Sequence, residues 1–196
     1  MNRKKIILVA FILMALAQWA VPGKMIWEKE RVLELGKEFK FMTAPIDPSD
    51  PFRGKYIVLQ YEENSIEVET DTWTEGESIY VILKTDVNGF AGIDSVSKEK
   101  PEALTDFVLA KVGYVSGKDI KTVNVIFPFD RFYMEESKAY PAEQEYNKAQ
   151  LDTTKTTYAL VNIKDGAAVL KDVMIDGVSI RDIVKNGQGK SNENLD

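Results

Sequence analysis

Residues 129–145 form the part of the chain whose side chains could do chemistry together. One arginine lies there among aromatic residues, and carboxylates follow it; these residues are Phe129, Arg131, Phe132, Tyr133, Glu135, Glu136, Tyr140, Glu143 and Glu145. Aromatic rings with an arginine and carboxylates can line a pocket for a peptide, a sugar or a cation. Paired carboxylates can also act as acid and base in the hydrolysis of a glycosidic bond. A plain strand-to-helix corner held by an Arg–Glu ion pair is the third interpretation, and it needs no ligand.

The chain of 196 residues contains neither histidine nor cysteine, which narrows that chemistry. Disulfides, thiolate metal sites, a cysteine nucleophile and a Ser-His-Asp triad are excluded, and the commonest zinc ligand is missing. Any catalysis would therefore use carboxylates, lysine, tyrosine or serine. The net charge of −6 argues against a nucleic-acid partner, because phosphates require a basic surface. We expect no metal and no cofactor.

The segment Asp86-Val87-Asn88-Gly89 resembles the start of a calcium-binding loop. Such a loop needs a bidentate glutamate further along the chain, and position 97 is serine. Asn-Gly between two strand-like segments is instead a strong hairpin signal. We therefore expect a turn at this place and no calcium site.

The N-terminus predicts where the rest of the chain goes. Arg3, Lys4 and Lys5 precede an apolar run over residues 6–21, interrupted only by Gln18. Because basic residues hold that end of a helix in the cytoplasm, we predict a cytoplasmic tail over 1–5, a transmembrane anchor over 6–22 and export of the remainder. The run is near the short end for a span of about 20 residues. The competing interpretations are a signal peptide cleaved near residues 15–17, which also exports the domain, and a buried helix of a cytosolic domain.

Pro22-Gly23 is a turn or kink signal just after this run. Apolar residues then recur at helical spacing among charged ones, and Gly36 is a typical helix stop. We predict a separate juxtamembrane amphipathic helix over residues 23–36. Its apolar side would pack on the exported domain as a stalk or, alternatively, contact a helix of a partner.

From residue 37 onward, apolar and polar residues alternate in short segments bounded by turn signals. Strands are expected near residues 37–44, 55–63, 66–70, 77–86, 90–98, 107–115, 119–127, 156–164 and 167–174. Short helices are expected over 141–150 and near 179–184, and the polar tail 186–196 should be disordered. The fold class is therefore mainly β: an antiparallel sheet or sandwich-like domain over 37–185, with one N-terminal transmembrane helix and one or two short helices.

Residues 45–61 form the most distinctive motif, Pro-Ile-Asp-Pro-Ser-Asp-Pro-Phe-Arg-Gly-Lys-Tyr-Ile-Val-Leu-Gln-Tyr. Its three prolines force an extended approach, and Gly54 permits a bend at the strand entry. The following strand has apolar residues on both faces, so we expect it to be central and covered on both sides. Asp47, Asp50 and Arg53 would form either a binding rim or a rigid sheet entry with a local ion pair.

This motif resembles that of the bacterial GDYXXLXY family at four positions, which are Gly54, Tyr56, Leu59 and Tyr61. Lys55 stands where the family has aspartate. Residues 131–133, followed by Glu135, resemble the family's second signature, and the resemblance covers about residues 24–184. It implies a single-pass, membrane-anchored bacterial protein with an exported domain, and it supplies no catalytic residue.

We expect residues 47–56 and 130–136 to meet at one end of the sheet, with Arg53 or Arg131 paired there to Asp47, Asp50, Glu135 or Glu136. The rings of Phe129, Phe132 and Tyr133 should be largely covered. The candidate binding residues are Asp47, Asp50, Arg53, Arg131, Tyr133, Glu135 and Glu136.

With the anchor, these residues favour a binding or assembly module of the bacterial cell envelope. It would lie at the cell membrane with its C-terminal domain outside the cytoplasm, and its partner would be another membrane protein or a cell-wall component. A carboxylate-dependent hydrolase acting on an envelope component is the alternative.

Overall fold

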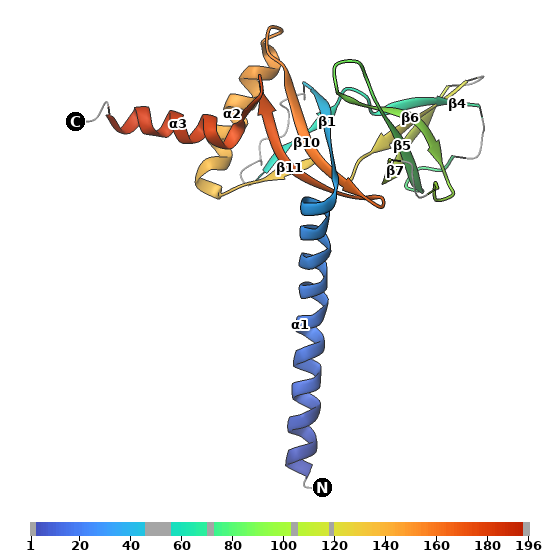
Figure 1. The fold of residues 1–196 in the computed structure, drawn as a ribbon, viewed down its shortest axis with the longest axis vertical. Helices are drawn as coiled ribbons and strands as arrows, with labels where there is room; N and C mark the ends of the chain where they lie inside the picture. Colours follow the sequence, from blue (N-terminus) through green and yellow to red (C-terminus); the bar gives the residue numbers. More distant parts are fainter. Residues whose placement is uncertain (1–2, 46–55, 70–72, 103–105, 118–119, 194–196) are drawn as a thin grey trace.

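A computed structural model describes residues 3–45, 56–69, 73–102, 106–117 and 120–193 of the chain, the last stretch with side chains to residue 187. Figure 1 shows a β-rich body at one end of a single long helix. The candidate residues Asp47, Asp50, Arg53 and Gly54 lie outside the described residues.

Helix α1 (Arg3–Leu35) carries the apolar run of the N-terminus. An 18-residue window of it reaches a mean hydropathy of 2.2, and none of that window is buried, so by length and composition the helix can cross a membrane. Pro22 lies inside the helix, which continues through Pro22-Gly23. The predicted break between an anchor over 6–22 and a separate helix over 23–36 is therefore wrong. A proline removes one backbone hydrogen bond, and the remaining hydrogen bonds of this 33-residue helix outweigh that loss.

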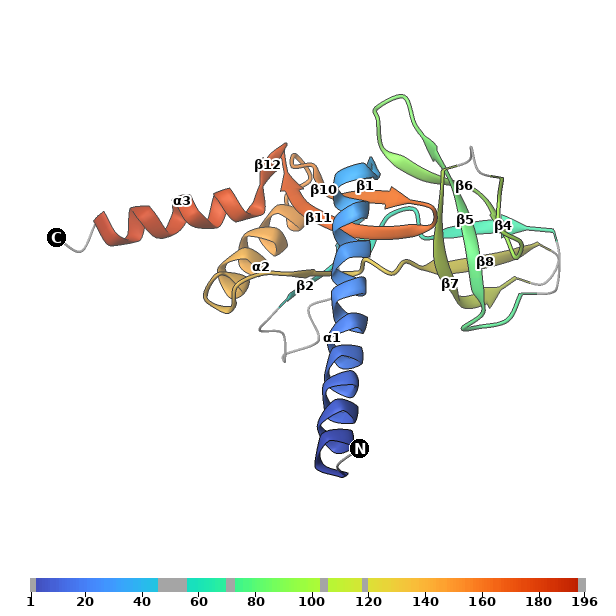
Figure 2. The ribbon, with the colours of Figure 1, turned by 60° about the horizontal axis from the view of Figure 1, so that its bottom comes forward.

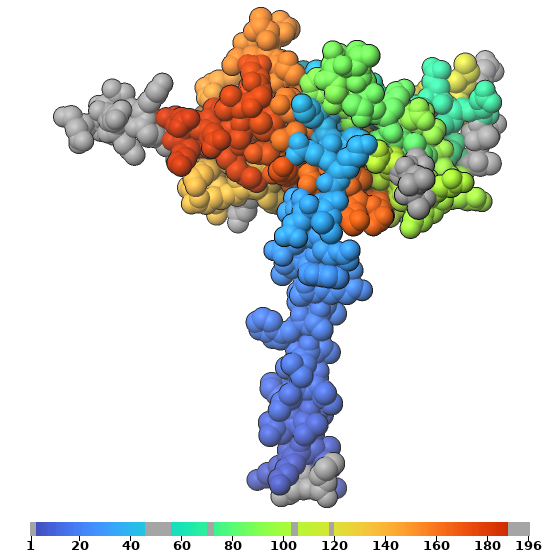
Figure 3. Space-filling view, in the orientation of Figure 1, coloured from blue at the N-terminus to red at the C-terminus, as the bar shows by residue number. Residues whose placement is uncertain are grey.

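The junction between α1 and the body is tight. Gly36 follows the helix directly, its N–H donates to the carbonyl of Val32 at 2.9 Å, and the first strand begins at the next residue. A Cβ at Gly36 would lie 2.3 Å from the Val32 carbonyl oxygen and 3.2 Å from the backbone of Ile163. The Val32 side chain is buried, and Asn162 donates to the carbonyl of Leu33 at 2.7 Å. The end of α1 is thus packed into the body, while Figure 3 shows the rest of the helix standing clear of it.

The first sheet is antiparallel, with its strands in the order β12-β11-β10-β1-β3. These strands are β1 (Lys37–Ala44), β3 (Gln60–Tyr61), β10 (Thr157–Lys164), β11 (Ala167–Ile175) and β12 (Val178–Ser179). Alternation places Phe39, Phe41 and Thr43 of β1 in the core, as a period of two requires. The turns at Asp165-Gly166 and Asp176-Gly177 have positive φ at both residues, the geometry of tight hairpins.

The second sheet is also antiparallel, in the order β4-β8-β7-β5-β6. Its strands are β4 (Ser65–Val68), β5 (Ser78–Thr85), β6 (Ala91–Ser97), β7 (Phe107–Ser116) and β8 (Lys121–Ile126). Ile79, Val81 and Leu83 of β5 alternate into the core. The predicted hairpin at Asn88-Gly89 joins β5 to β6, with Gly89 at φ +84°.

The two sheets share one hydrophobic core and lie side by side at the end of α1 (Figures 1 and 2). The tip of the β10–β11 hairpin meets β7, where the N–H of Leu109 donates to the carbonyl of Gly166 at 2.9 Å. Phe90, in the turn of the β5–β6 hairpin, makes a parallel bridge to Lys40 of β1. The prediction of a mainly β, antiparallel fold is therefore confirmed.

Two helices pack against each other beside the first sheet, α2 (Glu136–Leu151) and α3 (Ile180–Glu193). Helix α2 begins before the predicted 141–150, because the carbonyl of Glu135 already accepts hydrogen bonds from the first turn. Helix α3 continues to Glu193, so the disorder predicted from residue 186 is wrong for the described part of the tail. Ile180 and Val184 are buried and fix the first turns, and extending a formed helix is easier than starting one.

Candidate functional site

The two family-like segments pair with each other. Strand β2 (Tyr56–Val58) runs antiparallel to β9 (Arg131–Tyr133) as a separate two-stranded sheet. The opposed residues are Tyr56 and Tyr133, Ile57 and Phe132, and Val58 and Arg131. The N–H of Leu59 donates to the carbonyl of Asp130 at 2.8 Å and prolongs the pairing. The expected meeting of the two segments is thus confirmed from Tyr56 onward, and its part before Tyr56 lies outside the described residues.

The strand that carries the motif is not central. The single strand expected over 55–63 is two short strands, of which β2 pairs only with β9 and β3 is an edge strand of the first sheet. Tyr56 and Val58 are only half-buried, whereas Ile57 is buried. The expectation of cover on both faces is therefore wrong, because an aromatic and a β-branched residue suit the open face of a ribbon as well as a core.

Two residues of the motif are structural. Leu59 and Tyr61 are buried, and Tyr61 joins Phe41, Phe127 and Phe129 in a cluster of four rings whose six centroid distances all lie between 5.0 and 5.7 Å. The hydroxyl of Tyr61 donates to the carbonyl of Phe129 at 2.7 Å. Burial raises the pKa of Tyr61 well above its ordinary value, so its phenol stays neutral.

The open face of the ribbon carries the remaining motif residues, Tyr56, Arg131 and Tyr133, which we call the motif ladder. The guanidinium of Arg131 lies 5.1 Å from the ring centroid of Tyr56, and the rings of Tyr56 and Tyr133 are 5.4 Å apart. A hydrogen bond to Tyr133 and the neighbouring Tyr56 raise the pKa of Arg131. Tyr133 is 61% exposed. The ladder is thus an ordered but solvent-facing stack of two tyrosines and an arginine.

Phe129 and Phe132 are covered as expected, and Tyr133 is not. The ribbon is narrow, so Phe132 faces the body, where the guanidinium of Arg181 lies 4.8 Å from its ring centroid, and Tyr133 faces solvent. Among the described residues Arg131 forms its ion pair with Asp130, at 3.9 Å, and both side chains are about half exposed. The expected pair with Glu135 or Glu136 is therefore wrong, and Asp47 and Asp50 lie outside the described residues.

Two of the carboxylates that follow the ladder, Glu135 and Glu145, form separate surface pairs with lysines. Glu135 binds Lys138 at 2.5 Å. This ion pair and a hydrogen bond from the Ser137 hydroxyl together lower the pKa of Glu135. Glu136 is exposed in the first turn of α2. Glu145 binds Lys148 at 2.7 Å. Such lysine-neutralised carboxylates are ordinary for a solvated helix face.

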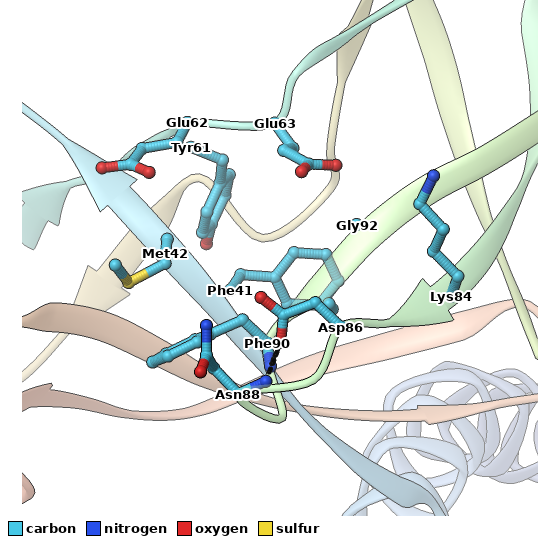
Figure 4. Close-up of a pocket in the computed structure, with 11 residues that line it drawn as sticks. Phe41, Met42, Tyr61, Glu62, Glu63, Lys84, Asp86, Asn88, Phe90 and Gly92 are labelled. Atoms are coloured by element: carbon cyan, nitrogen blue, oxygen red, sulfur yellow. Dashed lines mark hydrogen bonds between the residues drawn. The ribbon is translucent and has the colours of Figure 1, made fainter.

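A cavity of about 200 Å³ lies on another part of the body, between β1, β3 and the turn of the β5–β6 hairpin (Figure 4). We call it the hairpin cavity; its lining includes Phe41, Glu62, Glu63, Lys84, Asp86 and Phe90. Asp86 Oδ1 accepts the N–H groups of Asn88 and Phe90, each at 2.8 Å, which explains the turn. Glu63 Oε2 accepts the N–H of Ile93 at 3.2 Å.

Sequence reasoning missed the hairpin cavity, although one signal was present. Gly92 lies inside a strand, where glycine often marks a close approach. A Cβ at this position would lie 2.4 Å from Glu63 Oε2. Across the described residues, no three carboxylates are placed to hold a metal ion together.

The comparison with known families matches residues 18–173 to the family described as GDYXXLXY protein. No curated protein and no solved structure matches the chain. The matched region begins inside α1 and ends in β11, so it includes both strands of the motif ladder and the hairpin cavity. The chain therefore belongs to the GDYXXLXY family.

Proposed function

We propose that this protein is a membrane-anchored binding module of the bacterial cell envelope, whose β-rich body lies outside the cytoplasm and binds another protein through the motif ladder. The observation that carries the proposal is the pairing of the two family motifs into one exposed Tyr-Arg-Tyr stack. Tyrosine and arginine are the residue types most enriched where proteins bind each other strongly.

The order within the ladder supports this proposal. The guanidinium of Arg131 already lies 5.1 Å from the centroid of the Tyr56 ring, so part of its side-chain entropy is lost before a partner covers it. Backbone pairing of β2 with β9 holds the three side chains at fixed spacing. Tyr133 is 61% exposed, so its ring does not fill the core and is open to a partner.

The apolar helix supports the anchor. The exposed apolar surface of α1 is much larger than a soluble monomer tolerates in water. Arg3, Lys4 and Lys5 at its start favour a cytoplasmic N-terminus. Its last turn is packed against the body through Val32, so the body and the helix would act as one unit after insertion.

The alternative of a carboxylate-dependent hydrolase has less support. Glu135 and Glu145 each bind a lysine three residues further along the chain. A general acid needs a raised pKa, and the pKa of Glu135 is lowered.

Photocrosslinking in intact cells tests the binding proposal. A benzophenone amino acid at position 133 should give a crosslinked adduct with a discrete protein, and Arg131→Ala should abolish that adduct. Tyr114 on β7 is the matched control, because it is 59% exposed and lies outside the ladder. Equal adducts at positions 133 and 114, or none at either, would refute the proposal; an adduct with wall glycan alone would refute a protein partner.

Topology is tested separately. Alkaline phosphatase fused after residue 60 should be active, and green fluorescent protein fused there should be dark. The opposite pattern would contradict export. The intact N-terminal mass of the protein in purified membranes separates an anchor, which keeps residue 3, from a cleaved signal near residues 15–17.

A further inference from the structure

Gln18 is the one strongly polar residue in the apolar run of α1. We propose that two copies of this chain associate side by side in the membrane through Gln18, the side-chain amide of each copy donating hydrogen bonds to the Gln18 carbonyl oxygens of the other. The inference rests on the proposed anchor, and it does not depend on the motif ladder, which lies in the body.

The depth of Gln18 keeps its side chain away from water. At 1.5 Å per residue, Gln18 lies roughly 18 Å along the helix from Ile6 and about 14 Å from Trp27. A span over residues 6–27 therefore places it well inside the hydrocarbon. The side chains of a helix also lean toward its N-terminus, so that of Gln18 leans away from the nearer, outer surface. A glutamine side chain is much shorter than either distance, so it cannot reach the headgroups.

The fold supplies no partner for this side chain. Figure 3 shows this part of α1 standing clear of the body, and Gln18 is exposed. Across the part of the chain that the structure describes, its amide makes no hydrogen bond. An unpartnered polar group in hydrocarbon is costly, because no water is there to replace the missing hydrogen bond. A partner for Gln18 therefore has to come from another molecule.

Pro22 frees a second polar group of the same residue. Pro22 lies inside α1 and has no N–H, so the backbone carbonyl of Gln18, four residues earlier, loses its usual donor. In transmembrane helices such groups are satisfied by neighbouring helices or by serine and threonine side chains, among other means. Residues 6–27 contain no serine or threonine. Gln18 thus brings a donor and an additional acceptor to one point of the span, for two independent reasons.

A second copy matches these groups by symmetry. Two copies enter the membrane in the same direction, so their Gln18 residues lie at the same depth. Each Gln18 has two N–H donors in its amide and two carbonyl oxygens, one in the side chain and one in the backbone. A two-fold axis along the membrane normal would pair the donors of each copy with the acceptors of the other. A different protein would need its own polar residue at this depth.

The residues next to Gln18 allow a close approach of two helices. Ala15 lies about one turn before Gln18 on the same side of the helix, since residues three apart share a face. Small residues at such positions let two backbones come near enough for hydrogen bonds between helices. Leu16 lies on the opposite side, about 200° from Gln18 around the axis. The proposed contact face therefore consists of Ala15, Gln18 and Pro22.

Disulfide crosslinking locates the contact face, because the chain has no cysteine of its own. The full chain is reconstituted in vesicles of phosphatidylethanolamine and phosphatidylglycerol, and a cysteine is introduced by Ala15→Cys or, as the matched control, by Leu16→Cys. Oxidation should link the Ala15→Cys protein into a dimer and leave the Leu16→Cys protein monomeric. Equal crosslinking of both variants, or of neither, would overturn the proposal.

Energy transfer between labelled copies in the same vesicles measures the role of Gln18. Val87, in the turn of the β5–β6 hairpin, is fully exposed, so Val87→Cys provides a site for donor and acceptor dyes. Gln18→Leu should move half-dissociation to a protein-to-lipid ratio about tenfold higher, the loss expected when polar contacts between helices are removed. Gln18→Asn, which keeps the amide, should retain most of the association, and Leu16→Ala should leave it unchanged. Unchanged association in Gln18→Leu would refute the contact.

Pro22→Ala identifies the acceptor. Alanine restores the N–H that binds the Gln18 carbonyl within the helix. Weaker association of this variant would assign the backbone carbonyl as an acceptor, and unchanged association would assign the side-chain oxygens alone. Both results support a contact through Gln18.

The outcomes separate this contact from the proposed anchor. Recovery of the native chain outside the membrane fraction of cells would refute the anchor, and the contact with it. A chain that stays in membranes but shows no energy transfer at any protein-to-lipid ratio would refute the contact alone. Failure of the crosslinking at position 133 leaves both measurements unaffected.

Discussion

At the scale of single residues, the buried polar groups show how the body excludes water. The Thr43 hydroxyl donates to that of Thr157 at 2.8 Å, and Gln150 Nε2 lies 2.7–2.9 Å from the hydroxyls of Thr43, Thr157 and Tyr146. These contacts join β1 and β10 to α2. Burial raises the pKa of Tyr146 to about 12. A satisfied polar cluster of this kind stabilises one packing of helix on sheet over its alternatives.

The raised pKa of Tyr146 makes the stability of the protein depend on pH in the alkaline range. The folded pKa of about 12 exceeds the ordinary tyrosine pKa of about 10, so below pH 10 both states keep the proton and stability is unaffected. Above pH 10 the unfolded state loses the proton first, and the free energy of unfolding should fall by roughly 1.4 kcal/mol for each pH unit up to about 12. Tyr61, whose pKa is also raised, steepens the fall.

Urea unfolding between pH 9 and 12 measures this effect. Tyr146→Phe should remove the contribution of one proton from the slope of the free energy of unfolding against pH. An exposed control, Tyr140→Phe, should leave that slope unchanged. An identical slope in Tyr146→Phe and the wild type would show that Tyr146 titrates normally in the folded protein.

Neighbours in β9 should respond very differently to truncation. Arg131 is exposed, so Arg131→Ala should leave the midpoint of thermal unfolding essentially unchanged. Phe132 is 2% exposed, and Phe132→Ala should lower the free energy of unfolding by about 3–5 kcal/mol through the cavity it leaves. Thermal and urea unfolding of both variants check this contrast; a large loss in Arg131→Ala would mean that the ladder serves the fold.

At the scale of the elements, the sequence predicted the long strands well and the short ones poorly. Strands β1, β5 and β10 bury alternate residues, and that period is visible without a structure. Strand β9 has three residues, which is too short for a period, and it exists only because β2 lies beside it. The break between β2 and β3 is likewise set by two different partners, β9 and β1.

The part of the candidate site that is formed by the two sequence motifs was predictable from the sequence. The two motifs were expected to meet, and from Tyr56 onward they do, because β2 pairs with β9. The hairpin cavity depends on the approach of the β5–β6 turn to β1, a contact between distant segments. Gly92 signals a close contact at one wall, but nothing local in the sequence shows that the turn approaches β1, so the full lining could not be assembled in advance.

Two glycines test the contact between the sheets. Gly166 and Gly177 end similar Asp-Gly turns, with φ of +87° and +80°. A Cβ at Gly166 would lie 2.7 Å from the Phe107 ring, whereas one at Gly177 would meet nothing within 4 Å. Alanine strains the backbone at both positions, but only Gly166→Ala also overpacks the core.

Gly166→Ala should therefore lower the free energy of unfolding by about 1–3 kcal/mol more than Gly177→Ala. Urea unfolding of the two variants gives the difference directly. Equal losses would show that the Phe107 ring moves aside and that the hairpin tip is not tightly held against β7.

At the scale of the whole molecule, the continuity of α1 fixes how it would sit in a bilayer. From residue 6 to Trp27 the helix rises roughly 32 Å at 1.5 Å per residue, close to the hydrocarbon thickness of about 30 Å. Residues 6–21 alone would rise only about 22 Å. Trp27 is 57% exposed and carries Arg31 4.8 Å from its ring centroid, an arrangement suited to the headgroup level.

Depth-dependent quenching checks this placement. The chain has three tryptophans, Trp19, Trp27 and Trp73, so single-tryptophan proteins follow from double Phe replacements. In vesicles of brominated lipid, Trp27 should be quenched most by shallow bromines and Trp19 by deep ones, and Trp73 in the body by neither. Deep quenching of Trp27, or none, would contradict the span over residues 6–27.

With α1 inserted in a bilayer, the tight junction at Gly36 would leave no flexible linker between the membrane span and the body. Because Gly36 is packed against the backbone of Ile163, the orientation of the body about the membrane normal would follow the rotation of the helix about its own axis. Successive residues lie about 100° apart around the helix axis, so a neighbour that contacts one side of the span would also set the direction in which the Tyr-Arg-Tyr stack faces along the membrane surface. Contacts between α1 and a neighbouring membrane span would thus influence which partner the motif ladder can reach outside the bilayer.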